Sequence, residues 1–427
     1  MQRDELERLS KAELIDLVLR MQRPPKTSRT SSKPPSTDRK ARREQSRPGG
    51  AKPGHQGYSR ALSDAVSETL SHVPARCPCC RMALSPDLPA ELVSVQEQIE
   101  LPEIKPHVVQ HRRIALHCPG CGKRVAGKMP VAAQGSPFGP RLHALATYLK
   151  TFQALSYERL QATLADLFGL RISQGGLMNM LRRAQGRFQA KREDAVAALR
   201  RAQTVASDET GVRIEGSNAY HWIFHCQQAV VHQAAPTRAA AVVRAMMDGH
   251  RPAVWLSDRY AAQQGHAAAQ QTCLAHLARD VAHALEASED LLPFRLKLWL
   301  TSAFALANSV TSLAASTLAA KRRTLRRSLA DILTTPTSCD LARTIQNRFR
   351  RARDQLLTFA EWPGEVAATN NACERDLRPC VIQRKVTNGY RAMWAAQGEA
   401  DIRTVVDTAR LTRGTSIFST ILQTVTA

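Results

Sequence analysis

The sequence has no apolar stretch at its amino terminus. Its first residues, MQRDELERLS, are rich in charge and lack the hydrophobic segment of a signal peptide. This argues against secretion, and we expect a cytoplasmic protein. One uncharged stretch, residues 298–320, has the length of a membrane span, but it contains eight Ser, Thr or Asn residues and lies between Lys297 and Lys321. We interpret it as a buried helix.

Acidic residues are scarce relative to basic ones. The chain has 427 residues, with 60 Lys and Arg against 37 Asp and Glu, which gives a net charge of +23. A charge of this size favours a polyanionic partner, with nucleic acid ahead of an anionic membrane. The length and the 43% content of hydrophobic residues indicate several folded domains and exclude a single small binding module.

Ten cysteines in a chain without a signal peptide point to metal ligands or core thiols rather than to a disulfide scaffold. Four of them form two knuckles, Cys77-Pro-Cys79-Cys80 and Cys118-Pro-Gly-Cys121. Each knuckle offers two thiolates from a tight turn, so Cys77, Cys80, Cys118 and Cys121 are expected to bind one structural Zn²⁺ tetrahedrally. Cys79 is surplus and is an alternative to Cys80. Free or redox-active thiols are the competing interpretation.

Composition and periodicity predict a multidomain α+β protein. Its expected segments are an amphipathic helix (1–22), a basic disordered linker (23–61), a zinc-binding module (62–130), a helical DNA-binding region (131–200), the first part of a catalytic core (201–265), a helical insertion (266–363), and the last part of the core with the C-terminal tail (364–427).

Three of these segments have open roles. The helix at 1–22, with Ser10 and Glu13 as a capping box, serves either self-association or packing on its own chain. The linker carries eleven basic and two acidic residues in positions 23–60, so it either follows DNA phosphates or only connects domains. The break at Gly169 and the N-cap Ser173 suit a helix-turn-helix, but an ordinary helical hairpin has the same pattern.

After residue 203 the periodicity changes from helical to that of strands. TVAS is expected to end at Asp208, a hairpin to follow around residues 216–218, and AVWLS to end at Asp258. Several strands, a helix and a further strand, with Asp at the end of the first and last, is the order expected of a ribonuclease H-like α/β core. The glycine-free segment 266–363 then predicts the helical insertion.

Two carboxylates that meet at strand ends repel each other unless a divalent cation neutralises them. A pair of Mg²⁺ ions is the usual solution in phosphodiester chemistry. The candidate for a third carboxylate is Glu374 in TNNACERDLR, where Thr369 or Asn370 can cap a helix and leave Glu374 near its first turn. Asp208, Asp258 and Glu374 are therefore the predicted catalytic and magnesium-binding residues.

Several motifs in this order resemble transposases of the insertion sequence 66 family. They are SSKPPSTD, RPGGAKPGHQG, the paired cysteines, SDETGV around Asp208, WLSDRY around Asp258, CLAHLARD from Cys273, TNNACERDLR around Glu374, and Arg384-Lys385 before Gly389 and Arg391. The family's acidic triad falls on Asp208, Asp258 and Glu374. The resemblance implies transposition by the DDE mechanism, with hydrolysis at the element's ends and strand transfer.

The resemblance also implies cofactors and partners. They are catalytic Mg²⁺ or Mn²⁺, structural Zn²⁺, double-stranded DNA at the element ends and the target, a homo-oligomer in the synaptic complex, accessory proteins encoded by the same element, and association with the bacterial nucleoid rather than a membrane. Cys273, His276 and Arg279 match the family's C-x-x-H-x-x-R stretch. The residues expected to contact DNA are His276, Arg279, Arg375, Arg378, Arg384 and Lys385.

Alternatives remain at two levels. His276 and Arg279 either contact DNA or orient the carboxylates, and a second metal site with Cys273 and His283 is a further possibility. The whole chain is either an active transposase or an inactive or domesticated one that acts as a DNA-binding regulator. A membrane-associated basic protein, which rests on residues 298–320 alone, is a third interpretation.

Overall fold

The computed structural model describes residues 60–130 and 134–426, with a few isolated residues before position 60. It divides into two compact units, residues 40–105 and residues 106–427 with 1–39, each of which is described by itself. Most of the predicted helix at 1–22 and of the linker at 23–61 lies outside the described residues. The capping box is confirmed: the backbone N–H of Ser10 donates to Glu13 Oε2 at 2.7 Å, and that of Glu13 donates to Ser10 Oγ at 3.3 Å.

The zinc-binding module has little regular structure in its described part. In the smaller unit a single antiparallel bridge, Arg76 to Ala83, closes the first cysteine knuckle. In the larger unit β1 (Ala115–His117) pairs antiparallel with β2 (Arg124–Ala126), and the second knuckle forms the turn between them.

A mixed five-stranded sheet forms the centre of the larger unit, with the order β5-β4-β3-β6-β7. The strands are β3 (Thr204–Ile214), β4 (Ser217–His225), β5 (Val230–Ala235), β6 (Val254–Ser257) and β7 (Ala269–Thr272). The first three form an antiparallel meander, while β6 and β7 run parallel to β3. The β3–β4 turn is Glu215-Gly216, and both residues have positive φ, as a two-residue hairpin turn of type I′ requires.

Two predictions about strands were wrong. Asp208 does not end a strand, because β3 continues unbroken to Ile214 while paired with β4. The strand β7 was assigned to the helical insertion, because its sequence AQQT has no apolar pattern. Side chains explain why AQQT is nevertheless a strand: the Gln271 side chain accepts from the backbone N–H of Phe359, and Thr272 Oγ1 donates to Gln355 at 2.8 Å.

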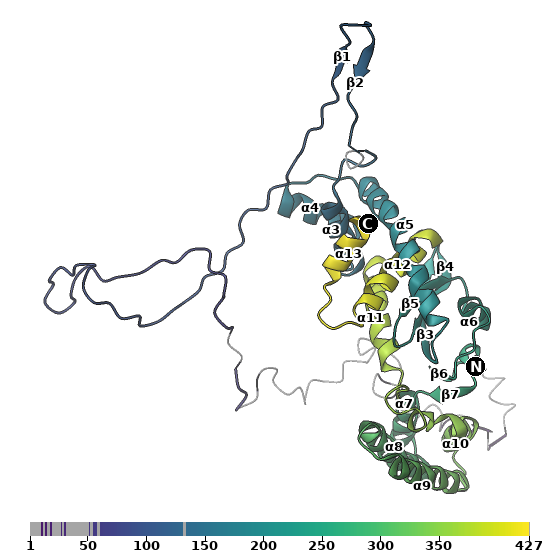
Figure 1. The fold of residues 1–427 in the computed structure, drawn as a ribbon. Coiled ribbons are helices and arrows are strands. Elements are labelled where there is room, and N and C mark those ends of the chain that lie inside the picture. Colours follow the sequence, from purple (N-terminus) through teal and green to yellow (C-terminus); the bar gives the residue numbers. More distant parts are fainter. Residues whose placement is uncertain are drawn as a thin grey trace. The chain divides into compact units, whose positions relative to one another are not determined.

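Helices cover both faces of the sheet (Figure 1). On one face Trp222, Phe224 and Trp255 pack against α5 (Gln174–Leu199) and α6 (Ala240–Met247). On the other face lie α11 (Asn371–Thr387), which packs on Ile223, and α12 (Met393–Ala409), whose Thr404 and Thr408 bond to β5. Residues far apart in sequence thus enclose the same strands.

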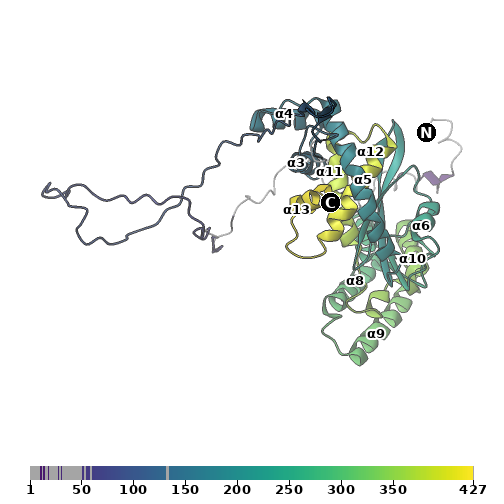
Figure 2. The ribbon, with the colours of Figure 1, turned by 45° about the horizontal axis from the view of Figure 1, so that its top comes forward.

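The predicted insertion is helical from residue 274 onward. It contains α7 (Leu274–Ala287), α8 (Leu291–Ser309), α9 (Ala315–Leu333), α10 (Asp340–Ala352) and the short 3-10 helices η4 (Arg353–Gln355) and η5 (Thr358–Ala360). The helices α8, α9 and α10 gather at one end of the sheet, away from α3 and α4 (Figures 1 and 2). The uncharged stretch 298–320 is divided between α8 and α9, and among the described helices none is long and apolar enough to cross a membrane.

The helical region before the sheet contains α3 (Pro140–Thr151), α4 (Tyr157–Phe168) and the long α5. The predicted boundaries are confirmed here: Gly169 ends α4 with φ of 64°, and the hydroxyl of Ser173 accepts from the N–H of Gly176 to cap α5. The helices α3 and α5 share a core with α12 and α13 (Ile417–Thr426), so this region packs directly on the C-terminal helices.

Candidate active site

Sheet register aligns the first two predicted carboxylates. The strands β3 and β6 pair in parallel from Thr204 with Val254 to Ala206 with Leu256. Asp208 and Asp258 lie two residues further along, where β6 has ended and β3 continues paired with β4. The two side chains therefore emerge at the same level of the sheet, at the carboxyl edge of its parallel part.

Asp208 lies in a strongly anionic environment. Burial raises the pKa of its carboxyl to about 8, and the nearby charges of Glu209, Asp258 and Glu374 add to the increase. The N–H of Glu209 donates to Asp208 Oδ1 at 2.9 Å and opposes the shift only in part. A half-buried carboxyl whose charge is resisted by three other acids is a group that a cation would stabilise.

Asp258 is fixed by its own loop. Its Oδ1 accepts from the backbone N–H of Tyr260 at 2.7 Å, and its carbonyl oxygen accepts from the Gln264 side chain at 3.0 Å. This turn leaves the second carboxylate oxygen available. Asp258 therefore has a defined orientation, and no residue that the structure describes forms an ion pair with it.

The third carboxylate, Glu374, comes from α11. This helix begins after Asn370 and holds Glu374 in its first turn, as predicted. Asn370 is fully buried, but its side chain does not cap the helix: its Nδ2 donates to the carbonyl oxygen of Ser207 at 2.8 Å, and its backbone N–H donates to Cys273 Sγ at 3.1 Å. Asn370 thus attaches the start of α11 to the residue that precedes Asp208.

Residues of α7 orient Glu374. Arg279 Nη2 donates to Glu374 Oε2 at 3.3 Å, and His276 Nε2 lies 3.8 Å from Oε1. Ligand atoms of Cys273, His276 and Glu374 lie within 4.8 Å of one another, whereas His283 does not belong to this group. Burial lowers the pKa of His276, which favours its neutral form. Of the two roles considered for His276 and Arg279, these contacts fit carboxylate orientation.

Glu209, the neighbour of Asp208, has different partners. Its side chain accepts from Arg238 Nη2 at 2.5 Å and from the Gln263 side chain, on the face of the sheet that carries Trp222. Arg238 also stacks over the Tyr260 ring, 3.8 Å from its centroid. Strand alternation therefore separates two adjacent acids: Asp208 faces α11, and Glu209 is held in an ion pair on the opposite face.

The three carboxylates fit a hard divalent cation. Carboxylate oxygens are the ligands that Mg²⁺ and Mn²⁺ prefer. Glu374 Oε1 is buried and has no hydrogen-bond partner, which is unusual for a buried anionic oxygen. Asp208, Asp258 and Glu374 together could hold the ion, and this orphaned oxygen has a place in such a site.

The two cysteine knuckles have the same local geometry. In the first, the N–H of Arg81 donates to the Cys77 carbonyl at 2.9 Å, and Arg81 has φ of 60°. In the second, the N–H of Gly122 donates to the Cys118 carbonyl at 2.8 Å, and Gly122 has φ of 70°.

The hydrogen bonds to sulfur also match. Backbone N–H groups of Cys80 and Cys79 lower the pKa of the Cys77 thiol, and those of Cys121 and Gly120 lower the pKa of the Cys118 thiol. Cys80 therefore occupies the position of Cys121, which supports Cys80 rather than Cys79 as the ligand. Thiols that accept N–H bonds in tight turns suit Zn²⁺.

Two family models match the chain. The model described as the transposase IS66 family matches residues 135–398, and the model described as the zinc-finger binding domain of transposase IS66 matches residues 63–122. The first covers more than half of the chain. The chain belongs to the transposase IS66 family. No curated protein matches it.

Membership in the IS66 family confirms the resemblance and sets the coarse identity of both parts. The larger unit carries a mixed α/β transposase domain, preceded by a zinc-finger domain whose match supports bound Zn²⁺. The family match indicates a transposase that acts on DNA.

The predicted DNA contacts of this IS66 protein have different environments. Arg375, Arg378 and Lys385 are exposed on α11. Arg384 is half-buried and directs one nitrogen to the Thr210 hydroxyl at 3.3 Å and to the Gly211 carbonyl. The exposed residues lie at spacings of three and seven, close to one helix face.

Sequence reasoning missed a second group of potential metal ligands. His221, His232 and Cys380 are buried together, with ligand atoms within 4.8 Å of one another. Their meeting depends on the pairing of β4 with β5 and on the docking of α11, so no local motif indicates it. Strand alternation predicts that His221 lies on the same face of the sheet as Ile223. The sequence does not show how β5 aligns with β4, so it could not place His232 beside His221.

Proposed function

We propose that this protein is an active DDE transposase, which cuts phosphodiester bonds at the ends of an insertion sequence and joins them to target DNA. The observation that carries the proposal is the convergence of Asp208, Asp258 and Glu374 from three separate elements. Parallel register aligns the first two, and the Asn370–Ser207 hydrogen bond attaches the helix of the third. A regulator without catalytic activity would not need its three carboxylates to be held in position by such contacts.

The catalytic core is proposed to be ribonuclease H-like. Its strand order, with a three-stranded antiparallel meander followed by two parallel strands beside the first, supports this assignment. The helical insertion between β7 and α11 falls between the second and third carboxylates. It therefore separates them in sequence without separating them in the proposed site.

The three carboxylates are proposed to hold catalytic Mg²⁺ or Mn²⁺. When bound, such ions stabilise both the attacking and the leaving oxygen of a phosphodiester. The protein's part is to present anionic oxygens in fixed positions. Arg279 and His276 restrain Glu374, the Tyr260 N–H restrains Asp258, and Asn370 keeps α11 against β3.

Double-stranded DNA is proposed to contact the basic residues around this site. Arg375, Arg378 and Lys385 on α11 present exposed cations to phosphates. Arg384, Arg279 and His276 are proposed to extend this set of contacts. Because transposition joins two element ends, the acting species is proposed to be a homo-oligomer at the nucleoid, assisted by proteins that the same element encodes.

The zinc ion is proposed to be bound by Cys77, Cys80, Cys118 and Cys121. The zinc-finger match includes both knuckles, which supports their participation in one domain. Four thiolates satisfy the tetrahedral preference of Zn²⁺. The residue range 62–130 and the helical region 131–200 would then supply DNA recognition ahead of the catalytic core.

The test is cleavage and strand transfer by the full chain on DNA that carries the element's own ends, with and without Mg²⁺. In Asp208→Asn, Asp258→Asn and Glu374→Gln variants we expect the rate to fall by about 10³-fold or more, because the charge that holds the metal is lost. DNA binding should persist, since no cation is removed. A gel-shift titration measures binding in parallel.

The matched control is Glu209→Gln, which removes one charge at the adjacent position. Because Glu209 faces Arg238 instead of the triad, the variant should keep much of its activity and lose some thermal stability. Full activity in Asp208→Asn, or equal loss in Glu209→Gln, would refute the site. Binding without cleavage by the unmodified chain under any divalent ion would instead support the regulator.

A further inference from the structure

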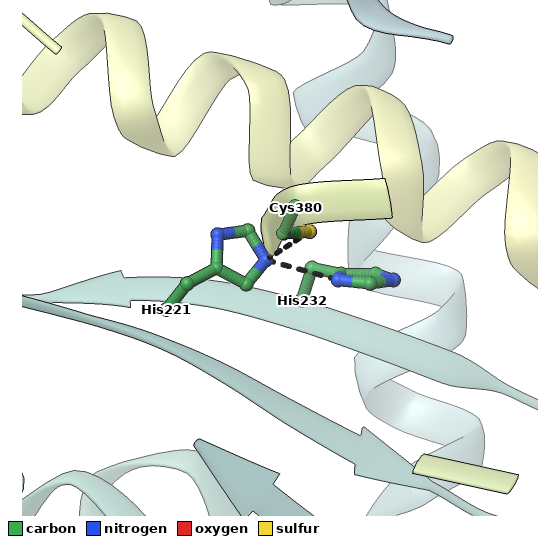
Figure 3. A group of neighbouring side chains, drawn as sticks. All are labelled: His221, His232 and Cys380. Carbon is green, nitrogen blue, oxygen red and sulfur yellow. Dashed lines mark hydrogen bonds between the residues drawn. The ribbon is translucent and has the colours of Figure 1, made fainter. Parts of the chain in front are cut away.

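A buried cluster of three side chains lies between the sheet and α11. His221 comes from β4, His232 from β5 and Cys380 from α11, and each is at most 5% exposed. Figure 3 shows the two imidazoles and the thiol directed toward one another. His221 Nε2 lies 3.0 Å from His232 Nδ1 and 3.4 Å from Cys380 Sγ.

These distances are close to those of a tetrahedral metal site. With Zn–N bonds of about 2.0–2.1 Å and a Zn–S bond of about 2.3 Å, two nitrogen ligands lie about 3.3 Å apart, and a nitrogen and a sulfur ligand about 3.6 Å apart. The observed separations are shorter by only a few tenths of an ångström. Small side-chain rotations would therefore open the cluster enough to admit an ion.

The surroundings orient the ligands as metal sites require. His232 Nε2 lies 3.2 Å from Asp407 Oδ2, so a proton on Nε2 leaves Nδ1 free toward the cluster. A carboxylate that holds the second nitrogen of a ligating histidine is a common outer partner of bound metals. Asp407 is itself restrained by Arg410 at 3.2 Å.

A positive charge near the thiol favours the anionic sulfur that a metal would bind. The guanidinium of Arg403 acts electrostatically on Cys380. Arg403 is completely buried and bonds to Glu399 at 2.8 Å. A thiolate is the form of cysteine that binds metals.

Unsatisfied polar atoms remain on the same buried face of α11. Gln383, one turn beyond Cys380, is 1% exposed, and neither its amide oxygen nor its nitrogen has a hydrogen-bond partner. Buried amides are almost always bonded, so this exception calls for water or an ion in the vicinity. A closed hydrogen-bonded core would not leave a whole amide group unmatched.

We propose that His221, His232 and Cys380 bind one borderline-soft divalent ion of the zinc class, separate from the cysteine knuckles. Imidazole and thiolate ligands select Zn²⁺ over Mg²⁺. Binding displaces the thiol proton to solvent, and the proton of His221 moves from Nε2 to Nδ1, so both imidazoles bind in their neutral form. The ion would join β4 and β5 to α11, the helix that carries Glu374 six residues before Cys380.

Metal counting in the full chain tests the site. A Cys77→Ser/Cys118→Ser variant leaves each knuckle with one of its two proposed ligands. We expect it to bind one equivalent of Co²⁺ that shows the charge-transfer band of a cobalt–thiolate bond, which Co²⁺ held by carboxylates lacks. Adding Cys380→Ser should abolish the band and the ion that gives it. Adding Cys373→Ser, a buried thiol on the same helix outside the cluster, should change neither.

A second variant covers the case in which Cys380→Ser fails to fold. Asp407→Asn keeps all three ligands and should weaken Zn²⁺ affinity about 10–100-fold. Removing Zn²⁺ from the double-serine protein should also lower its melting temperature. The proposal is refuted if the double-serine protein gives no cobalt–thiolate band, if Cys380→Ser and Cys373→Ser give equal bands, or if Asp407→Asn leaves the affinity of this ion unchanged.

A consequence for catalysis rests on the proposed function. If the ion fixes α11, emptying the site should slow Mg²⁺-dependent cleavage about tenfold or more, with DNA binding retained, because a misplaced catalytic group is costly. Metal counting needs no DNA. It therefore tests the buried metal site even if no variant, and not even the unmodified chain, cleaves DNA. Stoichiometric binding with unchanged cleavage would refute the coupling to α11.

Discussion

Apolar side chains are largely exposed in residues 60–130 but are buried in a core in residues 134–426. In the first range Val93 is 91% exposed and Val108 84% exposed, and the regular structure consists of two strands of three residues. In the second, Trp222, Trp255 and Phe224 are fully buried between sheet and helices. Only the second range contains a core that can offset the entropy of folding.

The difference indicates where each range obtains its order. In residues 60–130 the two knuckles have matching hydrogen bonds, with N–H groups directed at the Cys77 and Cys118 thiols, while many apolar side chains remain exposed. Residues 134–426 have a packed core, and in the proposed site this core positions three carboxylates for a metal ion. Zinc is therefore expected to be structural in the first range, and the acidic-site metal catalytic in the second.

Loss of zinc is the strongest way to separate the two ranges. In Cys118→Ser we expect residues 62–130 to lose their amide protection almost completely, because the proposed zinc site holds this part of the fold. The core should retain its protection and its main melting transition. Hydrogen exchange with peptide resolution measures both at once. Unchanged protection of residues 62–130 in a zinc-free protein would show that the range orders itself.

The core and the segment 23–60 also differ in their balance of basic and acidic residues. Core cations are often paired, as Arg322 and Arg326 are with Glu361, each at 2.9 Å. Residues 23–60 instead carry eleven basic and two acidic residues, a net +9.

Deleting residues 23–60 should lower nonspecific DNA affinity, by about 10-fold or more at low salt, and flatten its salt dependence, since fewer counterions are released. Filter binding over a series of salt concentrations gives the slope of log affinity against log salt. The same slope with and without the segment would mean that it only connects domains, and that the core supplies the phosphate contacts.

The sequence predicted the three carboxylates because each belongs to a local pattern. Asp258 follows a short apolar strand, and Glu374 follows the cap signal of Asn370. The exact position of Asp208 within β3 was missed, since TVAS and GVRI are separated by polar residues that suggest a break. In the folded sheet β4 pairs with this segment throughout and overrides the local signal.

Features set by long-range pairing could not be predicted. The strand β7 has glutamines where strands usually have branched residues, and bonds from residues 355–359 stabilise it. Asn370 has the sequence signature of a cap, but its amide bonds to Ser207, 163 residues away. Both cases show a polar side chain whose partner is chosen by the tertiary fold.

Asn370 provides a smaller test of the core's preorganisation. Asn370→Ala removes the bond to Ser207 and should slow cleavage about tenfold, with a loss of about 1–2 kcal/mol in stability. The Mg²⁺ concentration for half-maximal activity should rise, because Glu374 is held less firmly, and a purely structural role would not change it. Asn371→Ala, at the exposed neighbouring position, is the control. An unchanged Mg²⁺ requirement in Asn370→Ala would exclude this positioning role.

The smallest predicted effect is on the pH dependence of stability. It arises because the three acidic side chains repel one another when no metal is bound. Burial and the charges of Glu209, Asp258 and Glu374 raise the pKa of Asp208 to about 8 in the folded protein, far above its value of about 3.9 in an unfolded chain. Between these values the folded state binds more protons than the unfolded state. The free energy of unfolding should therefore fall as pH rises from about 4 to about 8, and level off above that.

Other groups titrate in this window, so the informative quantity is the difference between the wild type and Asp208→Asn. Without divalent ions that difference should grow toward pH 8 to about 1–2 kcal/mol, a modest value because Asp208 remains partly solvated. Mg²⁺ should reduce it, since the ion compensates the charge that burial resists. Urea unfolding at pH 5 and pH 8, with and without Mg²⁺, measures all four values. If the wild type and Asp208→Asn respond identically to pH and to Mg²⁺, the three acids do not share one electrostatic site, and the proposed catalytic centre would lose its physical basis.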